Sequence, residues 1–155
     1  MKKICVFIGS RANYSSIKSV IMEIDKQPLL KLQVVLGASA ILERFGKVED
    51  LIKKDGFKID YIFHNLIEGE NPSTMAKSTG LGLMDSSLIF ENLKPDMVVI
   101  VGDRFEMMSV TIAAAYMNIQ IVHTMGGEVT GTIDESIRHA ITKFAHIHFP
   151  ANEDS

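Results

Sequence analysis

The stretch DMVVIVGDRFEMMSVTIAAAYMNIQIVHTMGGEVTGTIDESIRHAITKFAHIH, residues 96–148, decides the fold of this chain. Two apolar runs, Met97 to Val101 and Ile119 to Val122, flank a segment with helical spacing, and each run ends in charged or ionisable residues. Short continuous apolar runs separated by helices are typical of buried parallel strands. Ligands of open parallel sheets bind outside the carboxyl ends of the strands. The pattern therefore predicts an α/β domain with its functional rim just after these two strands.

The rest of the chain continues the alternation of strands and helices. Six strands are expected, over residues 3–8, 31–36, 58–63, 97–101, 119–123 and 146–149. Helices are expected over residues 15–26, 40–45, 49–55 and 74–92, with residues 9–14 as the first strand-to-helix loop. Ser73 or Pro72 is expected near the N-cap of the long helix, and Gly80 and Gly82 would let that helix pack closely on a neighbour. This alternation indicates βαβ units, that is, a parallel sheet with helices on both faces.

Composition narrows the possible functions. The 155 residues suit one domain, and 46% apolar with 23% charged residues is ordinary for a globular protein. The net charge of −3 gives no basic footprint for nucleic acid, and no apolar run reaches the length of a membrane span. The N-terminal apolar run is too short for a signal peptide, and the single Cys5 excludes an internal disulfide. Together these features favour a cytoplasmic location.

The first loop, Gly9-Ser10-Arg11-Ala12-Asn13-Tyr14, is a candidate anion site. The free amides at a helix start bind anions, and Arg11 would add a forked cation for phosphate, unless it merely pairs with a surface carboxylate. The loop is neither GxGxxG nor a Walker loop, so neither NAD nor ATP is indicated, and we expect no cofactor.

Two further clusters place ionisable groups on the same rim. Asp103 directly follows a strand, where a carboxylate can serve as general acid or base, or simply as the N-cap of the next helix. Asp134 and Glu135 begin a helix, and Arg138 and His139 follow each of them by four residues, so ordinary ion pairs are the plain alternative. The functional interpretation rests on accumulation along one rim: Arg11, Asp103, His123, Glu128 and Asp134.

A metal site is not expected. His146 and His148 would share one face of a strand, and His123 ends the neighbouring strand, but this spacing matches no zinc signature.

Three motifs together resemble a known family. GSRANY (9–14), VGDRFE (101–106) and HTMGGEVTGTIDESIRHAITKFAHIHF (123–149) are similar to the hydrolysing UDP-N-acetylglucosamine 2-epimerases of the sialic-acid pathway. The resemblance runs over the whole chain. It implies the N-terminal Rossmann-like half of a glycosyltransferase-B architecture, with residues 1–155 as that domain and a second, UDP-binding domain absent. An isolated fragment of this kind should be inactive or nearly so.

The resemblance also implies a reaction and roles for residues. UDP would be eliminated from UDP-N-acetylglucosamine with loss of the C2 proton, and water would add to the resulting 2-acetamidoglucal to give N-acetylmannosamine. Asp103, Asp134 and Glu128 match catalytic residues. Arg11 matches a residue near the diphosphate, and His123, Arg138 and His139 are assigned to substrate binding. Members of the family associate through their N-terminal domains, so a homo-oligomer is expected.

One departure from the family pattern leaves the substrate open. Met125 stands where related enzymes often have Glu or His, and a thioether cannot transfer protons. Either Glu128 carries more of the work or the substrate is a related sugar such as UDP-N,N′-diacetylbacillosamine. A non-hydrolysing epimerase and a non-catalytic flavodoxin-like binding domain are the remaining alternatives; the latter requires 155 residues to be the natural length.

Overall fold

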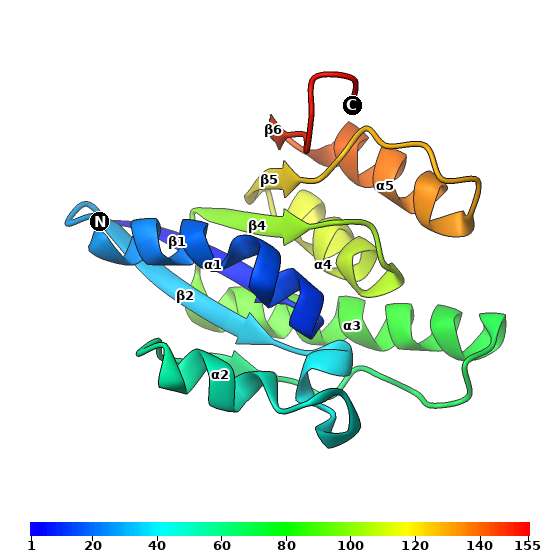
Figure 1. Ribbon diagram of the computed structural model, residues 1–155, viewed down its shortest axis with the longest axis horizontal. Coiled ribbons are helices and arrows are strands. Elements are labelled where there is room, and N and C mark those ends of the chain that lie inside the picture. The colour runs from blue at the N-terminus through cyan, green and yellow to red at the C-terminus, as the bar shows by residue number, and fades with distance from the viewer.

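The protein contains one parallel sheet of six strands, and the computed structural model describes all residues from 1 to 155. The strands are β1 (Lys2–Ile8), β2 (Leu30–Leu36), β3 (Tyr61–Ile62), β4 (Met97–Val101), β5 (Gln120–Thr124) and β6 (Ile147–Phe149). Their order across the sheet is β3-β2-β1-β4-β5-β6, and every neighbouring pair is parallel (Figure 1). This is the Rossmann order, in which the direction of winding reverses between β1 and β4.

Helices cover both faces of this sheet (Figure 1). Helices α1 (Arg11–Lys26) and α2 (Val48–Lys54) pack on one face. Helices α3 (Pro72–Leu93), α4 (Phe105–Tyr116) and α5 (Ile133–Phe144) pack on the other. The expected parallel sheet with helices on both faces is therefore present.

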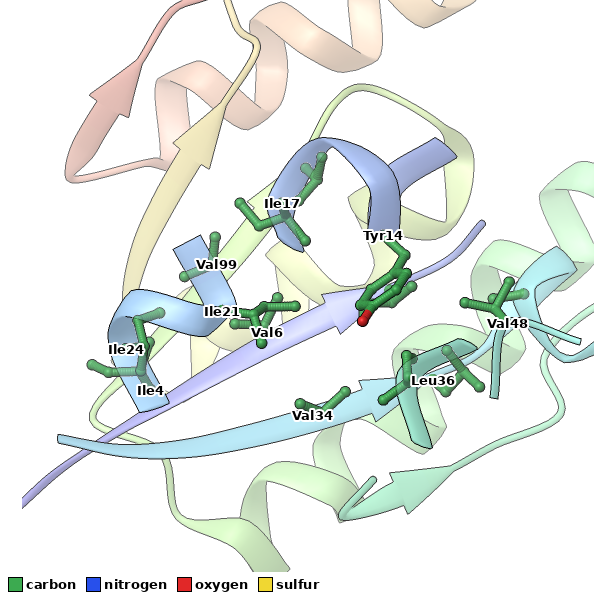
Figure 2. Packing of buried hydrophobic residues seen from close by; sticks show 14 of the residues in the cluster. Ile4, Val6, Tyr14, Ile17, Ile21, Ile24, Val34, Leu36, Val48 and Val99 are labelled. Carbon is green, nitrogen blue, oxygen red and sulfur yellow. The ribbon is translucent and has the colours of Figure 1, made fainter. Parts of the chain in front are cut away.

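The central strand β1 supplies the core of both layers. Its successive side chains point to opposite faces, so Val6 and Ile8 enter the cluster under α1 and α2 while Cys5 and Phe7 enter the cluster under α3 and α4. Figure 2 shows the first cluster, where Tyr14, Ile17, Ile21 and Ile24 of α1 lie over the strand residues. Full burial of one such aliphatic side chain contributes about 1.5–3 kcal/mol, so these layers fix the orientation of the strand ends.

The first helix begins earlier than the sequence pattern predicted. Residues 11–14 were expected in a loop, but α1 starts at Arg11, because the Ser10 hydroxyl accepts a hydrogen bond from the Asn13 amide at 3.1 Å. The expected helix over residues 40–45 is also wrong in detail, since two 3-10 turns occupy Ala38–Ile41 and Glu43–Phe45.

Helix α3 begins with a capping box that the sequence analysis missed. The N-cap is Asn71, not Ser73 or Pro72; its side chain accepts from the Thr74 amide at 3.0 Å, and the Thr74 hydroxyl accepts from the Asn71 amide. Close packing through Gly82 is confirmed, because a Cβ there would lie 2.5 Å from Oγ of Ser109 on α4. Gly80 does not share this role and faces open space.

The third strand is much shorter than the expected run of residues 58–63. Only Tyr61 and Ile62 pair with β2. Asp60, just before them, bonds to Val34 of β2 twice: its amide donates to the Val34 carbonyl at 2.8 Å, and its Oδ2 accepts from the Val34 amide at 2.9 Å. A side chain thus takes the place of part of the backbone ladder at this edge.

Candidate active site

The loops after β1 and β4 meet at the point where the winding of the sheet reverses. Asn13 joins them: its Nδ2 donates to the carbonyl oxygen of Val101 at 3.4 Å, and its Oδ1 accepts from the Gly9 amide at 3.3 Å. The crevice at such a reversal is where doubly wound sheets bind their ligands.

A cavity of about 570 Å³ opens at this reversal point. It is walled by the start of α1, the segment after β2, the loop between β3 and α3, and the start of α4. Its polar lining includes three arginines, Arg11, Arg44 and Arg104, and two glutamates, Glu68 and Glu70. The volume suits a ligand of ordinary small-molecule size.

The three arginines of this cavity differ in their partners. Arg44 pairs with Glu68 at 3.1 Å, and Nε of Arg104 donates to Glu106 at 2.9 Å. Arg11, at the first position of α1, pairs with no carboxylate. The surface ion pair considered for Arg11 is therefore absent, and its guanidinium remains available to an anion.

A second polar cluster lies at the ends of β4 and β5. Arg138, from α5, is buried, and its Nε donates to Oδ2 of Asp103 at 2.8 Å. Nη2 of Arg138 also bonds to the same oxygen, and Nη1 donates to the backbone carbonyl of Glu128. Asp103 is not the N-cap of α4, because Arg104 holds that position. Its Oδ2 is bonded to Arg138, and its Oδ1 has no hydrogen-bond partner.

His123 lies beneath this cluster rather than on its surface. It is 1% exposed, and its Nε2 donates to the Gly102 carbonyl at 2.8 Å while Nδ1 lies 3.1 Å from the Thr142 hydroxyl. A carbonyl only accepts, so Nε2 carries the proton and Nδ1 accepts from Thr142. Burial lowers the pKa of His123, which keeps the ring neutral. In this geometry His123 holds the Gly102–Asp103 turn in place.

Glu128 and Glu135 belong to the connection between β5 and α5 and the first turn of α5. The backbone of Glu128 is fixed by Arg138, and its side chain is half-buried. Oε2 of Glu135 accepts from the amides of Thr130 and Gly131 at 2.7 and 2.6 Å, which lowers the pKa of the Glu135 carboxyl. Glu135 therefore shapes the loop that carries Glu128.

Asp134 and His139 lie apart from the Asp103 cluster. Asp134 is half-buried and lines a separate hollow of about 250 Å³ between α3 and α5, which Met75 and Phe105 share with the larger cavity. It does not pair with Arg138, so the ion pair considered for them is absent. His139 is exposed, and its Nε2 lies 3.9 Å from Glu135. This is the ordinary pair that the sequence spacing suggested as the alternative to a site role.

The expected rim residues thus share one edge of the sheet but form separate groups. Asp103, Arg138 and the backbone of Glu128 come together, Arg11 lies in the cavity, and Asp134 lines the hollow next to that cavity. Sequence reasoning missed Glu106, whose carboxyl is completely buried beside Arg104. The only signal for it was its place in VGDRFE at a helix start.

Two other kinds of site find no support in the structure. No group of three or more His, Cys, Asp or Glu side chains is placed to hold a metal ion. No helix combines the length and apolar character needed to cross a bilayer.

A Rossmann-type sheet with an arginine-lined cavity at its reversal point places the chain in the class of doubly wound α/β proteins, which bind their ligands at that point. The family model described as UDP-N-acetylglucosamine 2-epimerase matches residues 22–155, and the chain belongs to this family. The resemblance carried by the three motifs is thereby confirmed.

Curated relatives and solved structures agree with this assignment. The chain is 39% identical over 153 residues to a hydrolysing GDP/UDP-N,N′-diacetylbacillosamine 2-epimerase of Campylobacter jejuni, covering 98% of the chain and 40% of the relative. It is 36% identical to the hydrolysing UDP-N,N′-diacetylbacillosamine 2-epimerase of Legionella pneumophila, covering 100% of the chain and 41% of the relative. It is 32% identical to a UDP-N-acetylglucosamine 2-epimerase of Neisseria meningitidis, covering 100% of the chain and 40% of the relative. The chain therefore spans about 40% of the length of these relatives.

Among solved structures, a UDP-N-acetylglucosamine 2-epimerase superimposes with a TM-score of 0.86 at 22% identity, covering 99% of this chain and 42% of that one. The Neisseria meningitidis enzyme bound to UDP-GlcNAc superimposes with a TM-score of 0.84 at 23% identity, covering 99% of this chain and 41% of that one. The expected fold class is confirmed: this is a Rossmann-like sheet of the glycosyltransferase-B kind.

Proposed function

We propose that this chain is the N-terminal domain of a hydrolysing 2-epimerase that acts on a UDP-linked 2-acetamido sugar. UDP leaves C1 as the C2 proton is removed, and water then adds to the resulting glycal with inversion at C2. The observation that carries the proposal is the Asp103–Arg138 pair at the mouth of the sheet, within a chain of this family.

The geometry of Asp103 suits proton transfer. Arg138 holds Oδ2 from one side, so the carboxylate has a fixed direction and its Oδ1 is free to meet a ligand. A base must lie within hydrogen-bond reach of its proton, and a fixed carboxylate meets that demand better than a mobile one. Glu128, from the loop before α5, and Asp134, in the first turn of α5, would stabilise positive charge that develops at C1.

The remaining residues act around these carboxylates. Arg11 is assigned to the diphosphate, since it lines the cavity and no carboxylate neutralises it. Arg138 and His123 act by holding Asp103 and its turn rather than by broad contact with substrate. His139 contributes from the exposed face of α5, where it remains available to a ligand or a second domain.

Two UDP-sugars are the leading substrates. UDP-N-acetylglucosamine follows from the family, and UDP-N,N′-diacetylbacillosamine is favoured by the names of the two relatives at 39% and 36% identity. Met125 supports the second sugar, because an exposed thioether in a left-handed turn offers an apolar surface rather than a proton carrier. Glu128 then carries any further proton transfer.

The test is product analysis with the full-length protein, given each UDP-sugar in turn and followed by NMR. Hydrolytic epimerisation predicts UDP together with the free 2-epimeric sugar, whereas a non-hydrolysing enzyme would give a UDP-linked epimer. Asp103→Asn should lose the reaction, and Asp25→Asn, an exposed carboxylate on α1, should keep it. An active Asp103→Asn enzyme would remove the central residue from the proposal.

The 155-residue chain alone is expected to be inactive, because the proposed function requires a second UDP-binding domain. We also propose that the full protein works in the cytoplasm as a homo-oligomer. Exposed apolar side chains on one side of α3 support the second point: Leu81, Met84 and Leu88. Light scattering that finds a monomer at micromolar concentration would contradict the oligomer.

A further inference from the structure

Glu106 occupies an unusual place for a carboxylate. It is the second residue of α4, it is completely buried, and it lies under the first loop, where a Cβ on Gly9 would come within 2.9 Å of its Cγ. Its Oε2 has no hydrogen-bond partner within the protein. Leaving a charged oxygen without a partner in the interior costs stability, so packing alone gives no reason for a carboxylate here.

The one partner of the Glu106 carboxylate is Arg104, which lines the cavity. Nε of Arg104 donates to Oε1 of Glu106 at 2.9 Å, and the Arg104 side chain remains 50% exposed while that of Glu106 is 0% exposed. Arg104 also lies over the ring of Phe105, with 5.8 Å from its Cζ to the ring centroid. The guanidinium thus has a hydrogen bond at Nε and an aromatic ring beside it, while neither Nη atom has a hydrogen-bond partner.

We infer that Glu106 is a positioning residue that holds Arg104 as a fixed, forked anion receptor in the cavity. The identity of the anion rests on the proposed function, under which it is a phosphate group of the nucleotide sugar. A guanidinium gripped through Nε presents its two terminal nitrogens in one plane, the arrangement that binds phosphate oxygens in pairs. Arg11 and Arg104 would then approach the anion from the ends of two neighbouring strands, β1 and β4.

A purely structural explanation accounts for only part of these observations. Acidic residues are common in the first turn of a helix because they interact favourably with the helix dipole. That benefit is available to an exposed glutamate and requires neither complete burial nor an approach to Gly9. Burial raises the pKa of the Glu106 carboxyl, and Arg104 opposes this shift by favouring the charged form.

The experiment is a double-mutant cycle on UDP binding, measured by calorimetry on the full-length protein. Glu106→Met removes the acceptor at similar side-chain length and should weaken UDP binding about tenfold, as loss of a charge-assisted contact does. Glu106→Gln keeps an oxygen acceptor and should restore part of the affinity. In an Arg104→Met background, Glu106→Met should change the affinity no further.

Additive effects of the two substitutions, or unchanged UDP affinity in a folded Glu106→Met protein, would overturn the inference. Circular dichroism melts of each variant distinguish misfolding from loss of the receptor, and the rescue by Gln cannot come from a general loss of packing. A wild-type protein that binds UDP but turns over no UDP-sugar would overturn the proposed function alone. A wild-type protein with no affinity for UDP would overturn the inference as well.

Discussion

Two arginine–carboxylate pairs at the same edge of the sheet have opposite surroundings. In the pair after β4 the side chains of Arg138 and Asp103 are 4% and 25% exposed, and in the pair across the cavity those of Arg44 and Glu68 are 48% and 65% exposed. The first pair is tied to the backbone of Glu128 and stands over the buried His123. The second joins two surface segments and nothing else.

The difference separates a rigid end of the site from an adaptable one. A buried pair cannot lose one member without leaving the other charge in the interior, whereas an exposed pair exchanges its partner for water at little cost. The Asp103 cluster can therefore keep a carboxylate fixed for chemistry. The exposed pair of Arg44 and Glu68 in the cavity wall can rearrange when an anion enters.

The largest effect is expected on removing the buried cation. Arg138→Met should lower the free energy of unfolding by about 3–5 kcal/mol, because Asp103 and the Glu128 carbonyl lose their partner. Arg44→Met is the matched control and should cost about 0–1 kcal/mol. Urea unfolding followed by circular dichroism measures both. Equal losses of unfolding free energy in the two variants would mean that burial makes no difference to the stability that the two pairs contribute.

The buried histidine predicts a pH dependence confined to the rigid end. The folded state lowers the pKa of His123 below its ordinary value of 6.5, so the unfolded chain binds the proton more readily. Stability from this group is complete above pH 6.5 and is lost as the pH falls through 6.5 toward the folded-state pKa. His123→Gln keeps a donor for the Gly102 carbonyl and removes the titration. The difference in unfolding free energy between wild type and variant should therefore shrink as the pH falls from about 8 to about 5, and a constant difference would contradict the prediction.

The buried glutamate should respond in the opposite direction. The folded state raises the pKa of Glu106, so its contribution to stability is present at low pH and is lost as the pH rises through the folded-state pKa. Glu106→Gln should therefore be as stable as the wild type or more stable at neutral pH, even though we expect it to bind UDP less well. Thermal melts at neutral pH test this. A clear fall in the melting temperature would show that the Glu106 charge stabilises the fold.

The sequence predicted the architecture more accurately than the contacts within the candidate site. The apolar runs predicted all six strands, because burial on two faces leaves a strong local signal in strands such as β1 and β4. The length of β3 was overestimated, since only Tyr61 and Ile62 form the strand and a bond from the Asp60 side chain to Val34 adjoins them. Local patterns do not reveal which partners meet across the fold.

Arg138 illustrates this limit. The four-residue spacing suggested an ion pair between Arg138 and Asp134. In the fold Arg138 pairs instead with Asp103, which lies 35 residues away in sequence. Glu106 shows the same limit, because an acidic residue in a first helical turn is ordinarily exposed. In the fold Gly9 approaches it from the end of β1, and the side chain is completely buried.

The smallest effect is expected at the open end of the site, where the comparison is sharpest. A double-mutant cycle of Arg44→Met and Glu68→Gln should give a coupling energy of about 0–1 kcal/mol in unfolding, which added salt reduces further. Glu68→Gln alone should nevertheless strengthen UDP binding, because it removes a carboxylate that competes with the anion for Arg44 in the cavity. Lys53→Gln and Glu49→Gln on α2 form a matched control pair outside the cavity and should leave UDP binding unchanged. A coupling energy near that of the buried pair would mean that the cavity wall is as rigid as the Asp103 cluster, and the division of the site into fixed and adaptable ends would fail.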